Sequence, residues 1–142
     1  MNLTIDTFAW VEIFRGTPLG RRAQGLMNEA EDCFTPSVAL AEVASIAVRS
    51  GLSDVLIRNQ LRSVAESSRI VPIDGRLAVV AASALTELRE SARARGLRTP
   101  GLSDALVLAT SRVLRAKLLT GDPHFRSFSE TLWLETHGES RG

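Results

Sequence analysis

The sequence predicts an α/β fold in which a mainly parallel sheet of four to five strands is covered by helices on both faces. Short apolar runs alternate along the chain with longer helical segments, and strands that alternate with helices pair in parallel. The chain has 142 residues, and no low-complexity linker divides it. We therefore expect one domain over residues 1–136, followed by a flexible polar tail at 137–142.

The expected strands are short, and several are continuous apolar runs, as fully buried strands are. They are residues 3–5, 33–35, 69–72, 118–120 and 131–134. Pro36 ends the second strand because proline lacks the backbone N–H that a strand ladder uses.

Six segments between these runs have the patterns of helices, and the segment that begins at residue 77 has the clearest apolar periodicity. The segments are 8–15, 19–30, 37–50, 53–67, 77–95 and 104–114. Asp6 or Thr7 is expected to cap the first helix, Ser37 the third and Ser103 the last. Residues 16–18 break the chain after the first helix, and Gly51 stops the third.

Composition narrows the class of protein. The net charge is +1, with 44% apolar and 23% charged residues, which is typical of a soluble globular protein and does not decide for or against nucleic acid. No apolar stretch reaches the roughly 18 residues of a membrane span, and no signal peptide is evident, so we expect a cytoplasmic protein without membrane contact. Cys33 is the only cysteine, which excludes an internal disulfide and indicates a buried thiol.

Four acidic residues are at positions where an acidic residue is not expected. Asp6 ends the first apolar run, and Glu42 is the only charge in residues 36–48. Asp104 opens the last helix, and Asp122 follows the fourth strand. Buried carboxylates are rare without a partner, and few cations are near these positions in the sequence. A hard divalent cation with oxygen ligands is the usual means of neutralising such a group.

Ligands of parallel sheets collect at the carboxyl ends of the strands, where these four residues are expected to lie. A carboxylate cluster suits Mg²⁺ or Mn²⁺, which can activate a water molecule for phosphodiester cleavage. Each residue also has a plainer interpretation. Asp6 and Asp104 suit the first turn of any helix, and Asp122 suits a turn. The four together favour the metal site.

Two further groups allow alternative interpretations. Four arginines before residue 104 could guide a polyanion, or could form a solvated helix end whose charge Glu87 and Glu90 partly offset. They are Arg89, Arg93, Arg95 and Arg98. The aromatic residues of the first helix, Phe8, Trp10 and Phe14, are expected mostly in the core, with base stacking open to one at most. His124 is expected to be a surface or loop residue.

The segments around the four acids resemble those of PIN-domain ribonucleases, especially the VapC-type toxins of toxin–antitoxin pairs. The similar segments are residues 3–16, 37–42, 102–109 and 118–125, in the order and approximate spacing of that family. The chain departs from the family pattern at Phe8, where a small polar residue is usual, and at His124, where an acid is frequent.

The resemblance implies a three-layer α/β/α sandwich and an endoribonuclease that depends on Mg²⁺ or Mn²⁺ and cleaves RNA with metal-activated water. It implies metal binding by Asp6, Asp104 and Asp122, with Glu42 completing the catalytic pocket. It further implies a homodimer that is inhibited by a small antitoxin, which binds DNA in the complex.

Two other protein classes match the sequence less well. A receiver domain needs a lysine after a late strand, whereas Lys117 precedes one, and a dehalogenase-type phosphatase needs an aspartate at the position of Phe8. One alternative is compatible with the same sequence features. It is an interaction protein with the nuclease fold that acts through a DNA-binding partner to regulate transcription.

Overall fold

The computed structural model describes residues 1–136, so the tail expected at 137–142 lies outside the described residues. Its strands are β1 (Leu3–Ile5), β2 (Cys33–Pro36), β3 (Arg69–Val71), β4 (Lys117–Thr120) and β5 (Thr131–Trp133). Its helices are α1 (Thr7–Arg15), α2 (Pro18–Glu29), α3 (Ser37–Arg49), α4 (Asp54–Ser67), α5 (Gly75–Ala94) and α6 (Leu102–Leu114), with a short 3₁₀ turn η1 (Pro123–Phe125). Within residues 1–136, no helix combines the length and the apolar character that a bilayer crossing requires.

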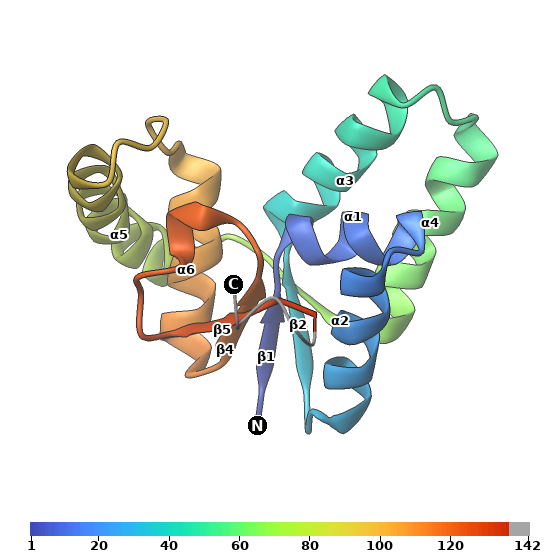
Figure 1. The fold of residues 1–142 in the computed structure, drawn as a ribbon, viewed down its shortest axis with the longest axis horizontal. Coiled ribbons are helices and arrows are strands. Elements are labelled where there is room, and N and C mark those ends of the chain that lie inside the picture. The colour runs from blue at the N-terminus through green and yellow to red at the C-terminus, as the bar shows by residue number, and fades with distance from the viewer. Residues whose placement is uncertain (137–142) are drawn as a thin grey trace.

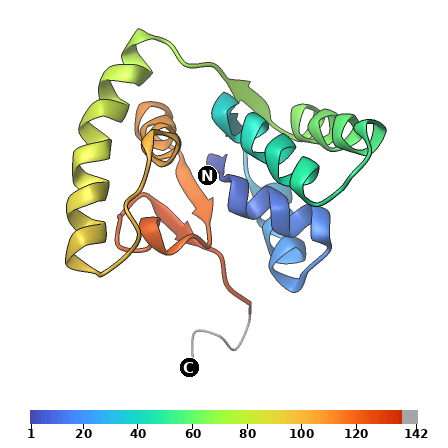
Figure 2. The same ribbon diagram turned by 90° about the horizontal axis from the view of Figure 1, so that it is seen from above.

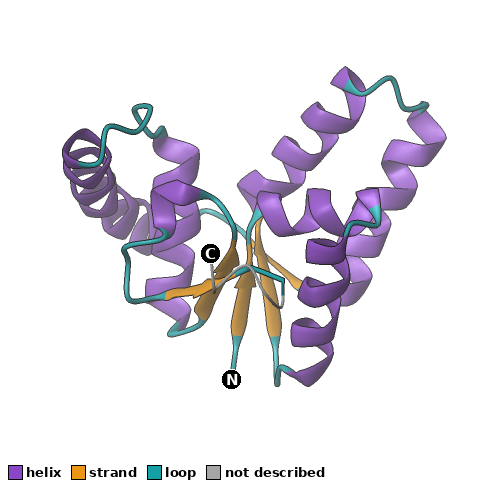
Figure 3. Cartoon of the chain, viewed as in Figure 1, coloured by secondary structure: helices purple, strands orange, loops and turns teal. Residues whose placement is uncertain are grey.

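The strands form one sheet in the order β3-β2-β1-β4-β5, and every neighbouring pair is parallel (Figure 3). The central strand β1 pairs with β2 on one side and with β4 on the other. The chain therefore winds outward from β1 to β3 and then crosses to the opposite side of β1. This reversal places a topological switch point between β1 and β4, where open parallel sheets bind their ligands.

The sheet is the middle layer of a three-layer sandwich, which confirms the expected architecture. Helices α5 and α6 cover one face, and α1, α2, α3 and α4 lie on the other side (Figures 1 and 2). Neighbouring residues of β4 serve both cores, because successive side chains of a strand point to opposite faces. Leu118 belongs to the core under α5 and α6, whereas Leu119 belongs to the core under α1 and α2.

The first residues of the helices confirm one of the expected N-caps and show that two others were wrong. Asp6 is the N-cap of α1, as expected, but α3 begins at Ser37 itself, with Pro36 in the cap position. Strand β2 ends at Pro36 and α3 begins at the next residue. Ser37 is therefore the first helical residue and cannot be the N-cap. Ser103 also lies inside its helix, because Gly101 is the N-cap of α6. There the Asp104 carboxylate accepts a hydrogen bond from the Gly101 amide (2.9 Å), as the acidic residue of a capping box does.

Candidate functional site

The four acidic residues come from four separate elements and line one cavity of about 430 Å³ at the carboxyl ends of the strands. Asp6 follows β1 directly, and Asp122 lies just beyond the end of β4. Glu42 is in the second turn of α3, and Asp104 is in the first turn of α6. The cavity therefore lies at the carboxyl ends of the strands, as expected from the sequence, and the strand order further places it at the switch point of the sheet.

Asp6 is the most deeply buried of the four, with 5% of its surface exposed. One carboxylate oxygen accepts the Thr7 amide at 2.8 Å, and the other accepts the Thr120 hydroxyl at 2.7 Å. Burial raises the pKa of Asp6 to about 7, because the negative charges of Asp122 and Glu42 add to the desolvation and outweigh the two hydrogen bonds. The fold thus holds a carboxyl group whose charge is poorly compensated.

Thr7 connects Asp6 to Glu42. Its amide donates to Asp6, and its hydroxyl donates to Glu42 Oε1 at 3.0 Å. Burial also raises the pKa of Glu42, and the charges of Asp104 and Asp122 act in the same direction. The electrostatic coupling of these carboxylates shows that they share one environment.

His124 lies in the connection between β4 and β5, as one of the two expected placements had it, but it is buried and not at the surface. It joins Asp122 to the loop before α6. Its Nδ1 lies 2.8 Å from Asp122 Oδ1, and its Nε2 lies 2.7 Å from the Arg98 carbonyl oxygen. Both partners are hydrogen-bond acceptors, so this geometry suits the imidazolium form, in which both nitrogens donate. Burial alone would lower the pKa of His124, but these hydrogen bonds, with the charges of Asp122 and Asp104, raise it.

Three arginines line the same cavity, which corrects the expectation of few cations near the acids. Arg15 ends α1, Arg49 ends α3, and Arg98 lies in the loop between α5 and α6. Among residues 1–136, none of the three guanidinium groups forms an ion pair or a hydrogen bond. They are therefore available to an anionic ligand.

The four arginines grouped from the sequence do not act together at the cavity. Only Arg98 lines it. Arg95 instead donates to the Pro123 carbonyl oxygen at 2.7 Å, and Arg89 donates to that of Pro100 at 3.4 Å. These two bonds hold the loop between α5 and α6, so their contribution to the cavity is structural.

The model of the PIN domain matches residues 3–130. The chain belongs to the PIN-domain family. None of the curated proteins matches its sequence.

Solved structures share the fold of this PIN domain. A toxin–antitoxin complex from Klebsiella pneumoniae contains a chain with 18% identity and a TM-score of 0.68, and the match covers 94% of this chain and 98% of that one. VapBC2 from Rickettsia felis, bound to a DNA fragment from its promoter, matches with 19% identity and a TM-score of 0.67 over 96% and 98% of the two chains. FitAcB from Neisseria gonorrhoeae matches with 23% identity and a TM-score of 0.61 over 84% and 87%. At these identities the likeness extends to the fold.

The donor set of the cavity suits a hard metal ion. Glu42, Asp104 and Asp122 each keep one carboxylate oxygen that accepts no hydrogen bond from residues 1–136. In the same range, no three acidic, histidine or cysteine side chains are placed closely enough to hold one ion together. The fit therefore rests on donor chemistry, because carboxylate oxygens of this kind are the ligands that Mg²⁺ and Mn²⁺ prefer.

Sequence reasoning missed Arg15, Arg49 and the partners of His124. Arg15 and Arg49 are in the last turns of the two helices that begin beside Asp6 and carry Glu42. A basic residue in the last turn of a helix usually interacts favourably with the negative end of the helix dipole. This pattern alone therefore does not indicate a binding role. The chain contains no local signal that residue 98 contacts residue 124.

Proposed function

We propose that this PIN domain is the toxin of a VapC-type toxin–antitoxin pair and acts as a metal-dependent endoribonuclease. The observation that carries the proposal is the convergence of Asp6, Glu42, Asp104 and Asp122 in one cavity. PIN domains are in general nucleases that use divalent metal ions. The toxin–antitoxin complexes among the structural neighbours support the biological context.

In this proposal, Asp6, Asp104 and Asp122 hold Mg²⁺ or Mn²⁺, and Glu42 completes the acidic pocket. The ion would supply charge neutralisation at the phosphate and a lowered pKa for the attacking water. Asp6 is fixed through both oxygens by Thr7 and Thr120, so its orientation is set before any ligand binds. His124 restrains Asp122 through two contacts with its Oδ1 atom, one from the backbone amide and one from Nδ1.

The unpaired arginines support a substrate with several phosphates. Arg15, Arg49 and Arg98 surround the carboxylates on three different elements. A single phosphate beside four carboxylates would be repelled, whereas phosphates on either side of the scissile one can bind to the arginines at the rim. RNA meets this requirement, because its phosphates are regularly spaced along the chain.

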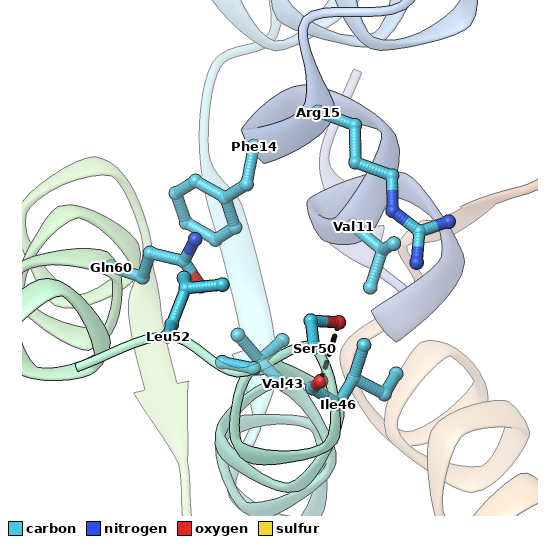
Figure 4. Close-up of a pocket in the computed structure, with 9 residues that line it drawn as sticks. Val11, Phe14, Arg15, Val43, Ile46, Ser50, Leu52 and Gln60 are labelled. Carbon is cyan, nitrogen blue, oxygen red and sulfur yellow. Dashed lines mark hydrogen bonds between the residues drawn. The ribbon is translucent and has the colours of Figure 1, made fainter. Parts of the chain in front are cut away.

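An apolar groove beside the acidic cavity supports an antitoxin partner. Side chains of α1, α3 and the segment that follows α3 face one another around a space of about 160 Å³ (Figure 4). They include Val11, Phe14, Val43 and Leu52. Val11, Arg15 and Ile46 line both the groove and the acidic cavity. We infer that an amphipathic segment of the antitoxin binds in the groove and that an arginine next to it enters the cavity.

Exposed apolar side chains at the tip of the α3–α4 hairpin support the proposed homodimer. Val48, Val55 and Leu56 are 63%, 66% and 52% exposed. Helices α3 and α4 project together away from the sheet (Figure 1). A second copy of the chain would remove this surface from water.

Co-expression combined with an RNA cleavage assay tests the proposal. The chain would be expressed with the small reading frame immediately upstream, and the purified chain would be incubated with RNA and Mn²⁺. We expect a co-purified partner, cleavage by the free chain, and inhibition by the partner until its arginines in the C-terminal half are replaced. A partner that co-purifies with a chain that is inert on RNA would instead favour the interaction protein that regulates transcription.

If no partner co-purifies, and the chain alone is harmless to growth and inert on RNA, the toxin assignment is wrong although the fold is right.

A further inference from the structure

Phe8 is an apolar side chain in the wall of an otherwise polar cavity. It is partly buried, and it lines the cavity together with Asp6 and Asp122. Its ring also packs against the core that contains Ile5 and Leu119. One part of the ring is therefore held by the protein, while another part faces the space in which the proposed substrate binds.

Gly121 determines where the ring of Phe8 can lie. A Cβ atom at position 121 would lie 2.4 Å from Cε1 and 2.7 Å from Cζ of Phe8. These distances are shorter than any real Cβ contact, so only glycine allows the ring this position. The ring of Phe8 thus lies against the residue that immediately precedes Asp122, just beyond the carboxyl end of β4.

The other two aromatic residues of α1 are committed to other contacts. Trp10 is 2% exposed, and its indole N–H donates to the Thr35 hydroxyl at 3.1 Å. Phe14 stacks on Trp10 with 5.9 Å between ring centroids and an interplanar angle of 20°. Phe14 also lines the apolar groove instead of the acidic cavity. Phe8 is thus the one aromatic residue of α1 that lines the acidic cavity.

Arg98 lines the same cavity and contacts the same short segment. The Arg98 carbonyl oxygen is bound by His124, while Phe8 contacts Gly121. Segment 121–124 therefore contacts both Phe8 and Arg98, and Phe8, Asp122 and Arg98 line the same cavity. Aromatic rings and arginines arranged along a groove are the elements with which proteins bind unpaired nucleotides, through base stacking and phosphate contacts.

We propose that Phe8 is a substrate-binding residue that stacks on a base of the RNA next to the scissile phosphate, while Arg98 binds an adjacent phosphate. The inference rests on the proposed ribonuclease function and adds a nucleotide subsite to it. The base over Phe8 must be unpaired, because a base stacked within a duplex presents no free face to a side chain.

The test combines a change in the protein with a change in the RNA. The best-cleaved oligonucleotide from a random-sequence RNA pool would be prepared with a single abasic site at each position near the cut. With Mn²⁺ and the wild-type chain, we expect one abasic position to raise KM by roughly 5- to 150-fold while kcat changes little. Phe8→Leu should raise KM similarly on intact RNA and should show no further loss on that abasic RNA.

Two variants serve as controls. Phe8→Tyr keeps an aromatic ring and should retain most of the affinity that Phe8→Leu loses. Phe14→Leu removes an α1 aromatic that does not line the acidic cavity, so the effect of the abasic site should persist in this variant. A merely structural role of Phe8 would weaken every RNA alike, with or without the base. If Phe8→Leu fails to fold, the abasic series on the wild-type chain still decides, because equal KM at every abasic position overturns the proposal.

The two proposals fail in different ways. If the wild-type chain cleaves RNA and the Phe8→Leu variant shows the same abasic penalty as the wild type, only the stacking assignment is overturned. A wild-type chain that neither binds nor cleaves any RNA of the pool with Mn²⁺ overturns the ribonuclease function and the subsite together.

Discussion

Acidic and arginine side chains gather at both ends of the sheet, but the arginine forms ion pairs with the acids at only one of the two ends. At the amino ends of β4 and β5, Arg112 donates to Glu87 and, at 2.8 Å, to Glu130. Burial alone would raise the pKa of Glu130, but the hydrogen bond and charge of Arg112 lower it. At the carboxyl ends, the arginines stay unpaired among residues 1–136, and the pKa values of Asp6 and Glu42 are raised.

This difference separates charges that stabilise the fold from charges that are kept for a ligand. A carboxylate with a lowered pKa stabilises the folded protein when it is ionised, whereas an ionised carboxylate with a raised pKa destabilises it. The second kind persists where another function requires it, and perturbed groups of this kind cluster at functional sites. The proposed metal and phosphate ligands would relieve the cost at the carboxyl ends.

The largest expected effect is on cleavage. Asp6→Asn or Asp104→Asn should lower kcat/KM for RNA cleavage with Mn²⁺ by about 100-fold or more, because each removes a proposed metal ligand. Glu87→Gln at the paired cluster is the matched control and should leave cleavage within a few-fold of the wild type. Equal losses in the control and in the site variants would show that the two ends do not differ in function.

Stability should respond to pH at Asp6. Because its pKa is raised to about 7 in the folded chain, the stability it contributes is complete below its unfolded pKa near 3.8 and is lost as the pH rises through about 7. The full loss is on the order of 4 kcal/mol well above that pH. Asp6→Asn removes this dependence, so the metal-free variant should exceed the wild type in free energy of unfolding at about pH 8.

Urea unfolding of both proteins across this pH range, in the presence of a chelator, measures the difference. His124, whose pKa is also raised, contributes a dependence of the same sign to both proteins and cancels in the comparison. A difference between the two proteins that does not change with pH would contradict the raised pKa of Asp6.

The arginines at the cavity should control how RNA binding depends on salt. Arg98→Ala should weaken RNA binding and reduce the slope of log K against log salt by about 0.7, as expected for one lost phosphate contact to a single strand. Arg93 is exposed and does not line the cavity, so Arg93→Ala is the matched control. Fluorescence anisotropy over a salt series would show the contrast, and an equal change of slope in both variants would remove Arg98 from the site.

The smallest effect is expected at the paired cluster. Glu130→Gln removes a carboxylate whose pKa is lowered, so the stability it contributes is present above its unfolded pKa near 4.5 and is lost as the pH falls through the lower folded value. At neutral pH the variant should be less stable by on the order of 1 kcal/mol. A gain of stability, as expected for Asp6→Asn, would mean that the two clusters do not differ as described.

Much of the fold could be predicted because its signals are local. The short apolar runs and the periodicity around Leu77 placed the strands and helices, and the alternation of both types predicted the parallel sheet. The meeting of Asp6 and Asp122 followed from the rule that parallel strands share a carboxyl edge. Helix starts were less accessible, because a serine near a helix start suits either the cap or the first turn, as Ser37 and Ser103 show.

The surroundings of the acids depended on tertiary contacts that leave no local pattern. Arg15 and Arg49 reach the cavity only because α1 and α3 pack together. The buried His124 contacts the carbonyl oxygen of Arg98, which is 26 residues away in the chain. The role of Gly121 is visible only once the ring of Phe8 is placed beside it.

Calorimetric titration with Mn²⁺ tests the central proposal, that Asp6, Asp104 and Asp122 bind one metal ion in the acidic cavity that Glu42 completes. The wild-type chain should bind Mn²⁺, and the affinity should fall at least about tenfold in both Asp6→Asn and Asp104→Asn. Glu87→Gln should bind as the wild type does. Unchanged Mn²⁺ affinity in both site variants would contradict the account, whatever their activity on RNA.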